Sequence, residues 1–212
     1  MNREVMLERV RLALGRKPEQ EPDPAPPLYL PAVQRTSDER VAMFTAALEA
    51  LAGCVIHCPS RDAARDRVMT LIEGRSAVAS RASYLRDCGI AGRDNVLSDF
   101  ASDAAYRQAC IDADVGITSA DYALADTGSL VMISGREESR LVSLLPPSHI
   151  AVVPVSHLVD NLDALLRRLP QPAGITSSMV LITGPSRTAD IEQILVRGVH
   201  GPGEITVVLV DD

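Results

Sequence analysis

The segment GITSADYALADTGSL places two carboxylates and several hydroxyls around two predicted strands. Thr118 and Asp121 follow one apolar run, and Asp126, Thr127 and Gly128 precede the next. Carboxylates and hydroxyls at strand ends can orient a polar substrate or transfer a proton. The same side chains can instead bond to their own backbone, in a helical turn and a hairpin-like turn. The sequence leaves both interpretations open.

A second segment, GPSRTAD, follows an apolar run and is predicted to open a helix over Ala189–Arg197. Ser186 or Thr188 can cap such a helix, and the free N–H groups at a helix start attract anions. Arg187 adds a bidentate donor suited to a carboxylate or a phosphate. Asp190 would place negative charge in the first turn and could satisfy the helix dipole without a ligand. We expect an anion-binding site here.

Two further candidates lie in the loop SGREESRLVSLLPPSHI. Arg140 adjoins an apolar run, which predicts a partly buried guanidinium that is either paired or able to clamp a carboxylate. His149 opens a buried strand, where a lone histidine is more often a hydrogen-bonded structural residue than a base or a metal ligand. His200 lies in the glycine-rich turn RGVHGPGE, which leads from a predicted helix into a strand and would therefore lie opposite the binding edge.

Apolar strands and helices alternate along the chain and would position these residues. Such alternation predicts an α/β fold with a mostly parallel sheet covered on both faces. Ligands of such sheets bind beyond the carboxyl ends of the strands, so we expect loops 118–128, 134–148 and 184–190 to share one edge. The strands at 129–134 and 150–155 lack a helix between them, which indicates a mixed sheet or an inserted loop. The predicted strands are 54–58, 76–80, 115–118, 129–134, 150–155, 179–183 and 205–210, and the predicted helices are 37–51, 60–73, 101–112, 157–169 and 189–197.

The N-terminal region differs in composition from the rest of the chain. Residues 1–16 show helical spacing of apolar side chains, residues 17–35 are rich in proline, and residues 36–212 carry the alternating pattern. We therefore expect an N-terminal amphipathic helix, a linker and an α/β domain. The helix either docks on its own domain or binds a partner, and the sequence favours neither.

Charge and cysteine spacing exclude several classes of protein. The net charge is -7 with no basic stripe, which argues against nucleic acid as a partner. Apolar runs fall far short of the roughly 20 residues of a membrane-spanning helix, and the N-terminus lacks a signal-peptide pattern, so we expect a cytoplasmic protein. Cys54 and Cys58 would lie about 13 Å apart along a strand, and no pair has CxxC spacing. We therefore expect reduced thiols, no metal site and no cofactor.

Three stretches together resemble the lactate-utilisation protein C family of LUD-domain proteins: GITSADYALADTGSLVMIS, RLVSLLPPSHIAVVP and ITGPSRTADIEQILVRGVHGPGEITVVLVDD. The resemblance covers residues 115–212. It implies a three-layer α/β fold like that of the ribose-5-phosphate isomerase and CoA-transferase group. It also implies a role beside iron–sulfur subunits that oxidise L-lactate to pyruvate, in a component without clusters of its own.

By position in these motifs, eleven residues are expected to line one pocket. They are Thr118, Asp121, Asp126, Thr127, Gly128, Arg140, His149, Ser186, Arg187, Thr188 and Asp190. Arg140 and Arg187 would hold a small carboxylate, and Asp121 or Asp126 would be the acid–base candidate. Two alternatives remain. One is a stand-alone isomerase, CoA transferase or ligase, although no Glu lies in the 116–130 loop to serve as a CoA-transfer nucleophile. The other is an interaction module that acts through the N-terminal helix.

Overall fold

The computed structural model of the chain describes residues 2–17, 35–135, 139–169, 176, 178–189 and 195–212. The chain divides into two compact units, Met1–Ala32 and Val33–Asp212. The first contains helix α1 (Arg3–Ala13), which Asn2 caps and in which no residue is buried. This helix lies within the predicted residues 1–16, whereas most of the predicted linker lies outside the described residues.

The larger unit is built on a six-stranded sheet. Its strands are β1 (Cys54–Cys58), β2 (Ala77–Ala79), β3 (Val96–Leu97), β4 (Val115–Ser119), β7 (Ser148–Pro154) and β12 (Glu204–Val210). In space they follow the order β1-β12-β7-β4-β2-β3, and every neighbouring pair is parallel. The predicted parallel sheet is therefore confirmed.

A second sheet of four strands packs against one face of the first. It consists of β5 (Tyr122–Leu124), β6 (Ser129–Ile133), β8 (Leu158–Val159) and β9 (Met179–Ile182). The order is β8-β5-β6-β9, and β6 runs antiparallel to both of its neighbours. The strands predicted at 129–134 and 150–155 thus belong to different sheets, which explains why no long helix joins them.

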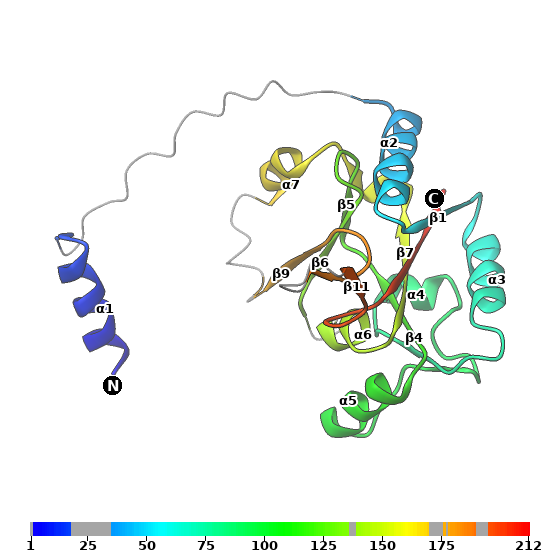
Figure 1. Cartoon of the computed structure of the whole chain (residues 1–212), viewed down its shortest axis with the longest axis horizontal. Helices are drawn as coiled ribbons and strands as arrows, with labels where there is room; N and C mark the ends of the chain where they lie inside the picture. Colours follow the sequence, from blue (N-terminus) through cyan, green and yellow to red (C-terminus); the bar gives the residue numbers. More distant parts are fainter. Residues whose placement is uncertain (1, 18–34, 136–138, 170–175, 177, 190–194) are drawn as a thin grey trace. The chain divides into compact units, whose positions relative to one another are not determined.

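Helices complete the layers. The helices of this unit are α2 (Ser37–Ala50), α3 (Arg61–Leu71), α4 (Ser83–Asp87), α5 (Asp103–Asp112), α6 (Arg140–Leu144) and α7 (Leu162–Arg168), with a 3-10 turn η1 (Val155–His157). Helices α3 and α4 cover one face of the six-stranded sheet, whereas α2 and the second sheet share a core on the other, as Figure 1 shows. Helices α5 and α6 pack beside β2 on that second face, and α7 packs on the second sheet. The predicted three-layer α/β fold is confirmed.

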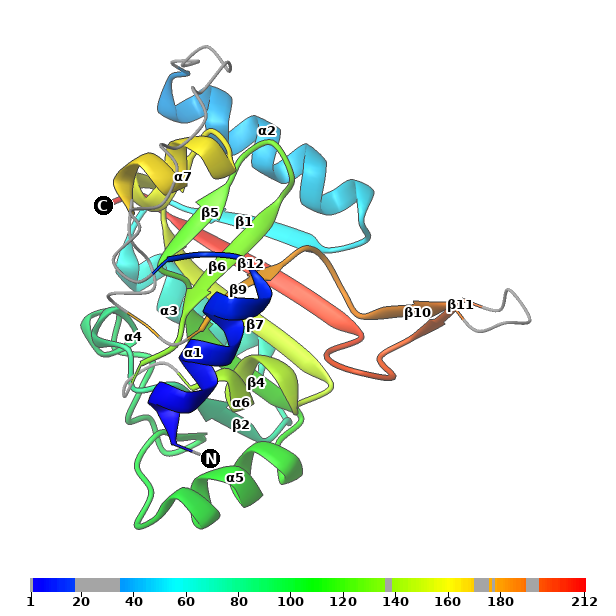
Figure 2. The ribbon, with the colours of Figure 1, turned by 90° about the vertical axis from the view of Figure 1, so that its left-hand side faces the viewer.

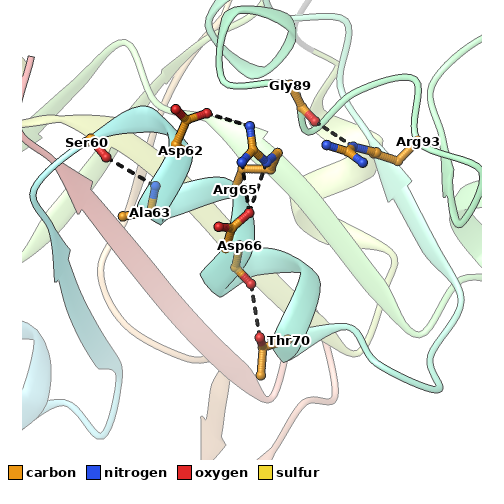
Figure 3. Close-up of polar contacts among 8 residues, drawn as sticks. All are labelled: Ser60, Asp62, Ala63, Arg65, Asp66, Thr70, Gly89 and Arg93. Carbon is orange, nitrogen blue, oxygen red and sulfur yellow. Dashed lines mark hydrogen bonds and ion pairs between the residues drawn. The ribbon is translucent and has the colours of Figure 1, made fainter.

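Helix α3 illustrates how local sequence sets an element's limits (Figure 3). The Ser60 hydroxyl accepts a hydrogen bond from the Ala63 N–H at 3.2 Å and caps the helix. Arg65 bridges the carboxylates of Asp62 and Asp66 on the surface. Such exposed pairs contribute little, so the helix is held chiefly by the apolar side chains that it buries against the sheet.

Two glycines permit close packing between layers. A Cβ on Gly116 would lie 1.9 Å from the Val142 carbonyl oxygen, so only glycine lets α6 rest on β4. Gly128, in the β5–β6 turn, has a φ of +64° and would place a Cβ 2.6 Å from the Leu48 nitrogen of α2. Both the turn conformation and the approach of α2 therefore require glycine at this position.

The helix predicted over 189–197 is wrong. Residues Arg187–Ala189 form strand β10 and Leu195–Arg197 form β11, and the two pair antiparallel. Figure 2 shows this hairpin extending away from the rest of the unit. The segment's branched residues suit a strand as well as a helix, and apolar spacing alone does not separate the two in short runs. Residues 190–194 lie outside the described part of the chain.

Other predictions need smaller changes. The helix predicted at 157–169 is confined to α7, because His157 ends the turn η1 and residues 158–159 form β8. Thr36, rather than Ser37 or Asp38, caps α2 and forms a capping box with Glu39. Cys54 is exposed, while the other three cysteines are buried, and all four are free. Within the described residues, no helix combines the length and apolar character needed to span a bilayer.

Candidate functional site

A cleft of about 420 Å³ lies between α6, strand β9 and the loop that precedes β12. Four segments that are distant in sequence line it, the fourth being the end of α2 at Leu51. Its apolar walls come mainly from β9, α6 and the end of α2. The lining residues are Leu51, Arg140, Ser143, Leu144, Val180, Leu181, Ile182, Thr183, Gly184, Pro185, Ser186, Arg187, His200, Gly201, Pro202 and Ile205.

The charge of this cleft is opposite to that of the whole chain. Arg140, Arg187 and His200 line it, and none of its described lining residues is acidic. The net charge of the chain is -7. Three cationic or ionisable nitrogen groups gathered without a carboxylate make a local site for an anion.

Arg140 is held at the cleft by the position of α6. The Ser139 hydroxyl accepts a hydrogen bond from the Leu141 N–H at 3.3 Å and caps this short helix, and the missing side chain of Gly116 lets the helix lie on β4. The Arg140 side chain is exposed, which corrects the prediction of partial burial. No hydrogen bond or ion pair joins its guanidinium to the described residues, so its donors remain available to a ligand.

Ser186 lies in the loop that links β9 to β10, and Arg187 is the first residue of β10. The Arg187 guanidinium donates a hydrogen bond to the Leu51 carbonyl at the end of α2. The Ser186 N–H donates to the Pro202 carbonyl at 2.8 Å, and the Ser186 carbonyl accepts from the Gly198 N–H at 3.1 Å. These bonds tie the GPSR loop to the His200 loop and fix one end of the cleft.

The cleft lies at an unexpected edge of the six-stranded sheet. Loop 198–203 enters β12 at its amino end, and β12 is parallel to its neighbours. The sequence predicts binding beyond the carboxyl ends and places His200 opposite that edge, yet this residue lines the cleft. The signal that could have found it is a histidine among Gly198, Gly201 and Gly203, since such a turn allows close backbone approach.

A chain of hydroxyls connects the β5–β6 turn with the rim of the cleft. Thr127 Oγ1 lies 2.8 Å from Ser129 Oγ, which lies 2.7 Å from Thr183 Oγ1. Thr183 lines the cleft, whereas Thr127 is exposed in the turn. The sequence predicted Thr127 as a site residue but did not identify Ser129 and Thr183. The hydrogen bond between Ser129 and Thr183 joins β6 to the end of β9, and this proximity arises only when the second sheet forms.

Thr118 and His149 lie in the buried interior rather than in the cleft. The Thr118 hydroxyl is 2.8 Å from His149 Nε2, and His149 is 1% exposed. Burial lowers the pKa of His149 to about 4, so its imidazole is neutral at pH 7. No described residue bonds to its Nδ1. His149 is therefore the buried, hydrogen-bonded structural histidine that the sequence favoured.

The two candidate acid–base residues are also outside the cleft. The Asp121 carboxylate accepts a hydrogen bond from the Ile133 N–H at 2.7 Å, and burial raises its pKa. Asp126 is exposed in the β5–β6 turn, where its N–H donates to the Asp160 carbonyl at 3.2 Å. Asp126, Thr127 and Gly128 therefore form the hairpin turn that the sequence left as an alternative.

The structure thus divides the predicted pocket. Arg140, Ser186 and Arg187 line the cleft. The backbone of Thr188 lies in β10, and Asp190 lies outside the described residues. The remaining residues lie in the interior or in the turn. Among the described residues, no group of three or more His, Cys, Asp or Glu side chains is placed to hold a metal ion.

Comparison with known proteins supplies the family. Lactate utilization protein C of Halalkalibacterium halodurans is 45% identical over 104 residues, which are 47% of this chain and 45% of that protein. The Bacillus subtilis protein of the same name is 41% identical over 104 residues, 47% of this chain and 43% of that protein. The chain therefore matches less than half the length of these curated relatives.

A solved structure and a family profile cover more of the chain. A DUF162-family protein from Deinococcus radiodurans superposes with a TM-score of 0.65 at 17% identity, over 84% of this chain and 99% of that one, which supports the fold alone. The profile of the LUD domain matches residues 41–210. This match spans nearly the whole of the larger unit, both sheets and the cleft included, and it confirms the resemblance seen in the motifs. The chain belongs to the LUD-domain family.

Proposed function

We propose that this protein serves lactate utilisation by binding a small carboxylate, such as L-lactate or pyruvate, in the cleft between α6 and β9. The observation that carries the proposal is the set of Arg140, Arg187 and His200 in a cleft whose described lining contains no acid. The shared name of the matched relatives, lactate utilization protein C, supports the choice of substrate.

The exposed Arg140 guanidinium would bind the carboxylate, since its planar donors match two carboxylate oxygens. Arg187 and the loop held by Ser186 would fix the other side of the ligand, and His200 would donate to its hydroxyl or keto oxygen. We place electron transfer on iron–sulfur partner subunits, because the four cysteines of this chain lack the spacing that such clusters use. This chain would therefore bind and present substrate.

Isothermal titration of the full chain with L-lactate and pyruvate tests the proposal. We expect saturable binding that Arg140→Ala weakens about tenfold or more, as expected for loss of a charge-assisted hydrogen bond. Arg107→Ala, at an exposed position on α5, is the matched control and should bind as the wild type does. Absence of lactate and pyruvate binding, or equal loss in the control, would contradict the proposal.

A larger ligand is the second candidate. The cleft volume of about 420 Å³ lies within the range of sites for cofactor-sized molecules, and most of its walls are apolar. A stand-alone enzyme acting on a phosphorylated or acyl substrate would use that extra volume. Ribose 5-phosphate, coenzyme A and ATP belong in the same titration, and saturable binding of one of them in place of lactate would favour this alternative.

A further inference from the structure

Strand β9 forms one edge of the second sheet. It pairs with β6 through Met179, Val180, Leu181 and Ile182, and no described strand pairs with its other side. An edge strand leaves alternate backbone N–H and C=O groups directed away from the sheet. Those groups are the pattern to which another extended chain can bond.

This edge lacks the shortness that protects two of the other described sheet edges, β3 and β8. The remaining edge of the six-stranded sheet, β1, is also paired on one side alone among the described strands, but its residues do not line the cleft. Strands β3 and β8, which end the two sheets elsewhere, contain two residues each. Strand β9 has the wholly apolar sequence MVLI, with no charge or proline, and Leu181 is 43% exposed. Proteins shorten, charge or cover such edges because unprotected ones pair with other chains. An unprotected edge is therefore a natural place for a partner strand.

The cleft follows this edge. Val180, Leu181, Ile182 and Thr183 all line it, although consecutive side chains of a strand point to opposite faces. A cavity that touches four consecutive residues must run along the strand's side rather than across one face. A peptide lying in the cleft would thus be placed as a fifth strand of the second sheet.

Charge decides which partner fits. Antiparallel pairing of β9 with β9 of a second copy would bring two sets of Arg140, Arg187 and His200 together, and like charges at an interface disfavour association. An extended segment with acidic side chains would instead meet cations on both sides of the cleft. Its apolar side chains would cover Leu144 and Leu181, which are 42% and 43% exposed.

We propose that β9 binds an extended, acidic and apolar segment of a partner protein by strand addition along the cleft. This inference rests on the proposed function in one respect, since it uses the same cationic cleft. It identifies the surface through which the chain would join its partner subunits. Binding would combine main-chain hydrogen bonds to β9 with charge-assisted bonds to Arg140 and Arg187.

Fluorescence anisotropy of the full chain with labelled octapeptides provides the test. The probe is an alternating Val-Glu peptide, and the comparison peptides are alternating Val-Lys and a Val-Glu peptide N-methylated at alternate amides. We expect the Val-Glu peptide to bind about tenfold or more tightly than either comparison peptide. The Val-Lys peptide lacks the charge that complements the cleft, and the N-methylated peptide lacks the N–H groups that would pair with β9. Equal affinity for all three peptides, or no binding, would overturn the inference.

Two variants locate the site. Leu181→Glu should abolish binding of the Val-Glu peptide by placing a like charge on the edge, whereas Leu166→Glu, at a residue of similar exposure on α7, should leave binding unchanged. Circular dichroism establishes that both remain folded. Titration of the wild-type chain with L-lactate, beside its titration with the Val-Glu peptide, separates the two proposals. Lactate binding without peptide binding overturns the strand addition alone, and peptide binding without lactate binding overturns the small-carboxylate site alone.

Discussion

At the residue scale, His149 shows how a polar side chain can be placed by the core rather than by ligand binding. Its strand, β7, runs between β4 and β12, so both edges of the strand are already paired. The imidazole shares one hydrogen bond with Thr118 and is otherwise enclosed. Such a group stays neutral, because burial of an imidazolium without a counter-charge is unfavourable.

The depressed pKa of His149 predicts acid destabilisation. The unfolded state takes up a proton near pH 6.5 and the folded state only near pH 4, so the free energy of unfolding is greatest above pH 6.5 and falls as the pH drops between these values. The fall should approach about 3 kcal/mol. Urea unfolding at several pH values measures it.

His149→Gln should remove most of this dependence between pH 6.5 and 4, whatever its effect on stability at pH 7. His200→Gln is the control, because it makes the same substitution at an exposed histidine. An unchanged slope in His149→Gln would show that other groups cause the acid sensitivity.

Only some of the residues predicted from the sequence to form one site lie together in the cleft. The two arginines could be identified from their residue type and their sequence neighbours, and both Arg140 and Arg187 line the cleft. The roles of Asp121 and Asp126 could not be assigned from the sequence, because a carboxylate near a turn can bond to the backbone as readily as to a ligand. His200 and Thr183 were missed because their proximity depends on the packing of α6 against two sheets, which no local pattern encodes.

At the scale of elements, apolar strands and well-capped helices were predictable, the short strands β2 and β9 included, whereas several other short elements were not. The strands β1, β4, β7 and β12 and the helices α2, α3 and α5 lie where apolar runs and caps placed them. Helix α6 has five residues, little more than one helical turn, and strands β3, β5 and β8 have two or three residues, so neither helical spacing nor strand alternation can show in them. The β10–β11 hairpin was mistaken for a helix because tertiary context overrides weak propensity.

The β5–β6 hairpin gives a test of how elements meet. Gly128→Ala should destabilise the protein by roughly 2–4 kcal/mol, because it adds a left-handed backbone penalty to a clash with the backbone of α2. The urea midpoint should fall at a constant m-value.

Gly74→Ala is the matched control for this substitution. Gly74 has a φ of +73°, and no other atom lies within 4 Å of the position that a Cβ would take, so only the backbone penalty of about 1 kcal/mol should remain. Equal losses of unfolding free energy in the two variants would mean that α2 moves at Leu48 and relieves the clash with the added Cβ.

At the scale of the whole molecule, the two units have separate structural roles. The four apolar core clusters found among the described residues all lie in residues 33–212, and the LUD-domain match begins at residue 41. Helix α1 leaves Val5, Met6, Val10 and Leu14 exposed within its own unit. An isolated helix of this length is marginal in water, so the stability of the domain should not depend on it.

Deleting residues 1–32 should therefore leave the thermal midpoint of the domain unchanged within about 2 °C, which is no more than the shift that loss of about 1 kcal/mol produces in a chain of this size. Lactate and peptide titrations of the shortened chain should also match the full chain. Differential scanning calorimetry provides the first measurement. A fall in midpoint would contradict the independence of the two units.

The place of β12 in the sheet bears on how the protein is made. This strand lies between β1 and β7, and among the described strands β1 pairs with no other. During synthesis, β1 emerges about 150 residues before its neighbour and must wait without a paired edge. The sheet can close only when residues 204–210 have left the ribosome, so the fold is completed and the cleft is formed only after the strands on both sides of β12 have been synthesised.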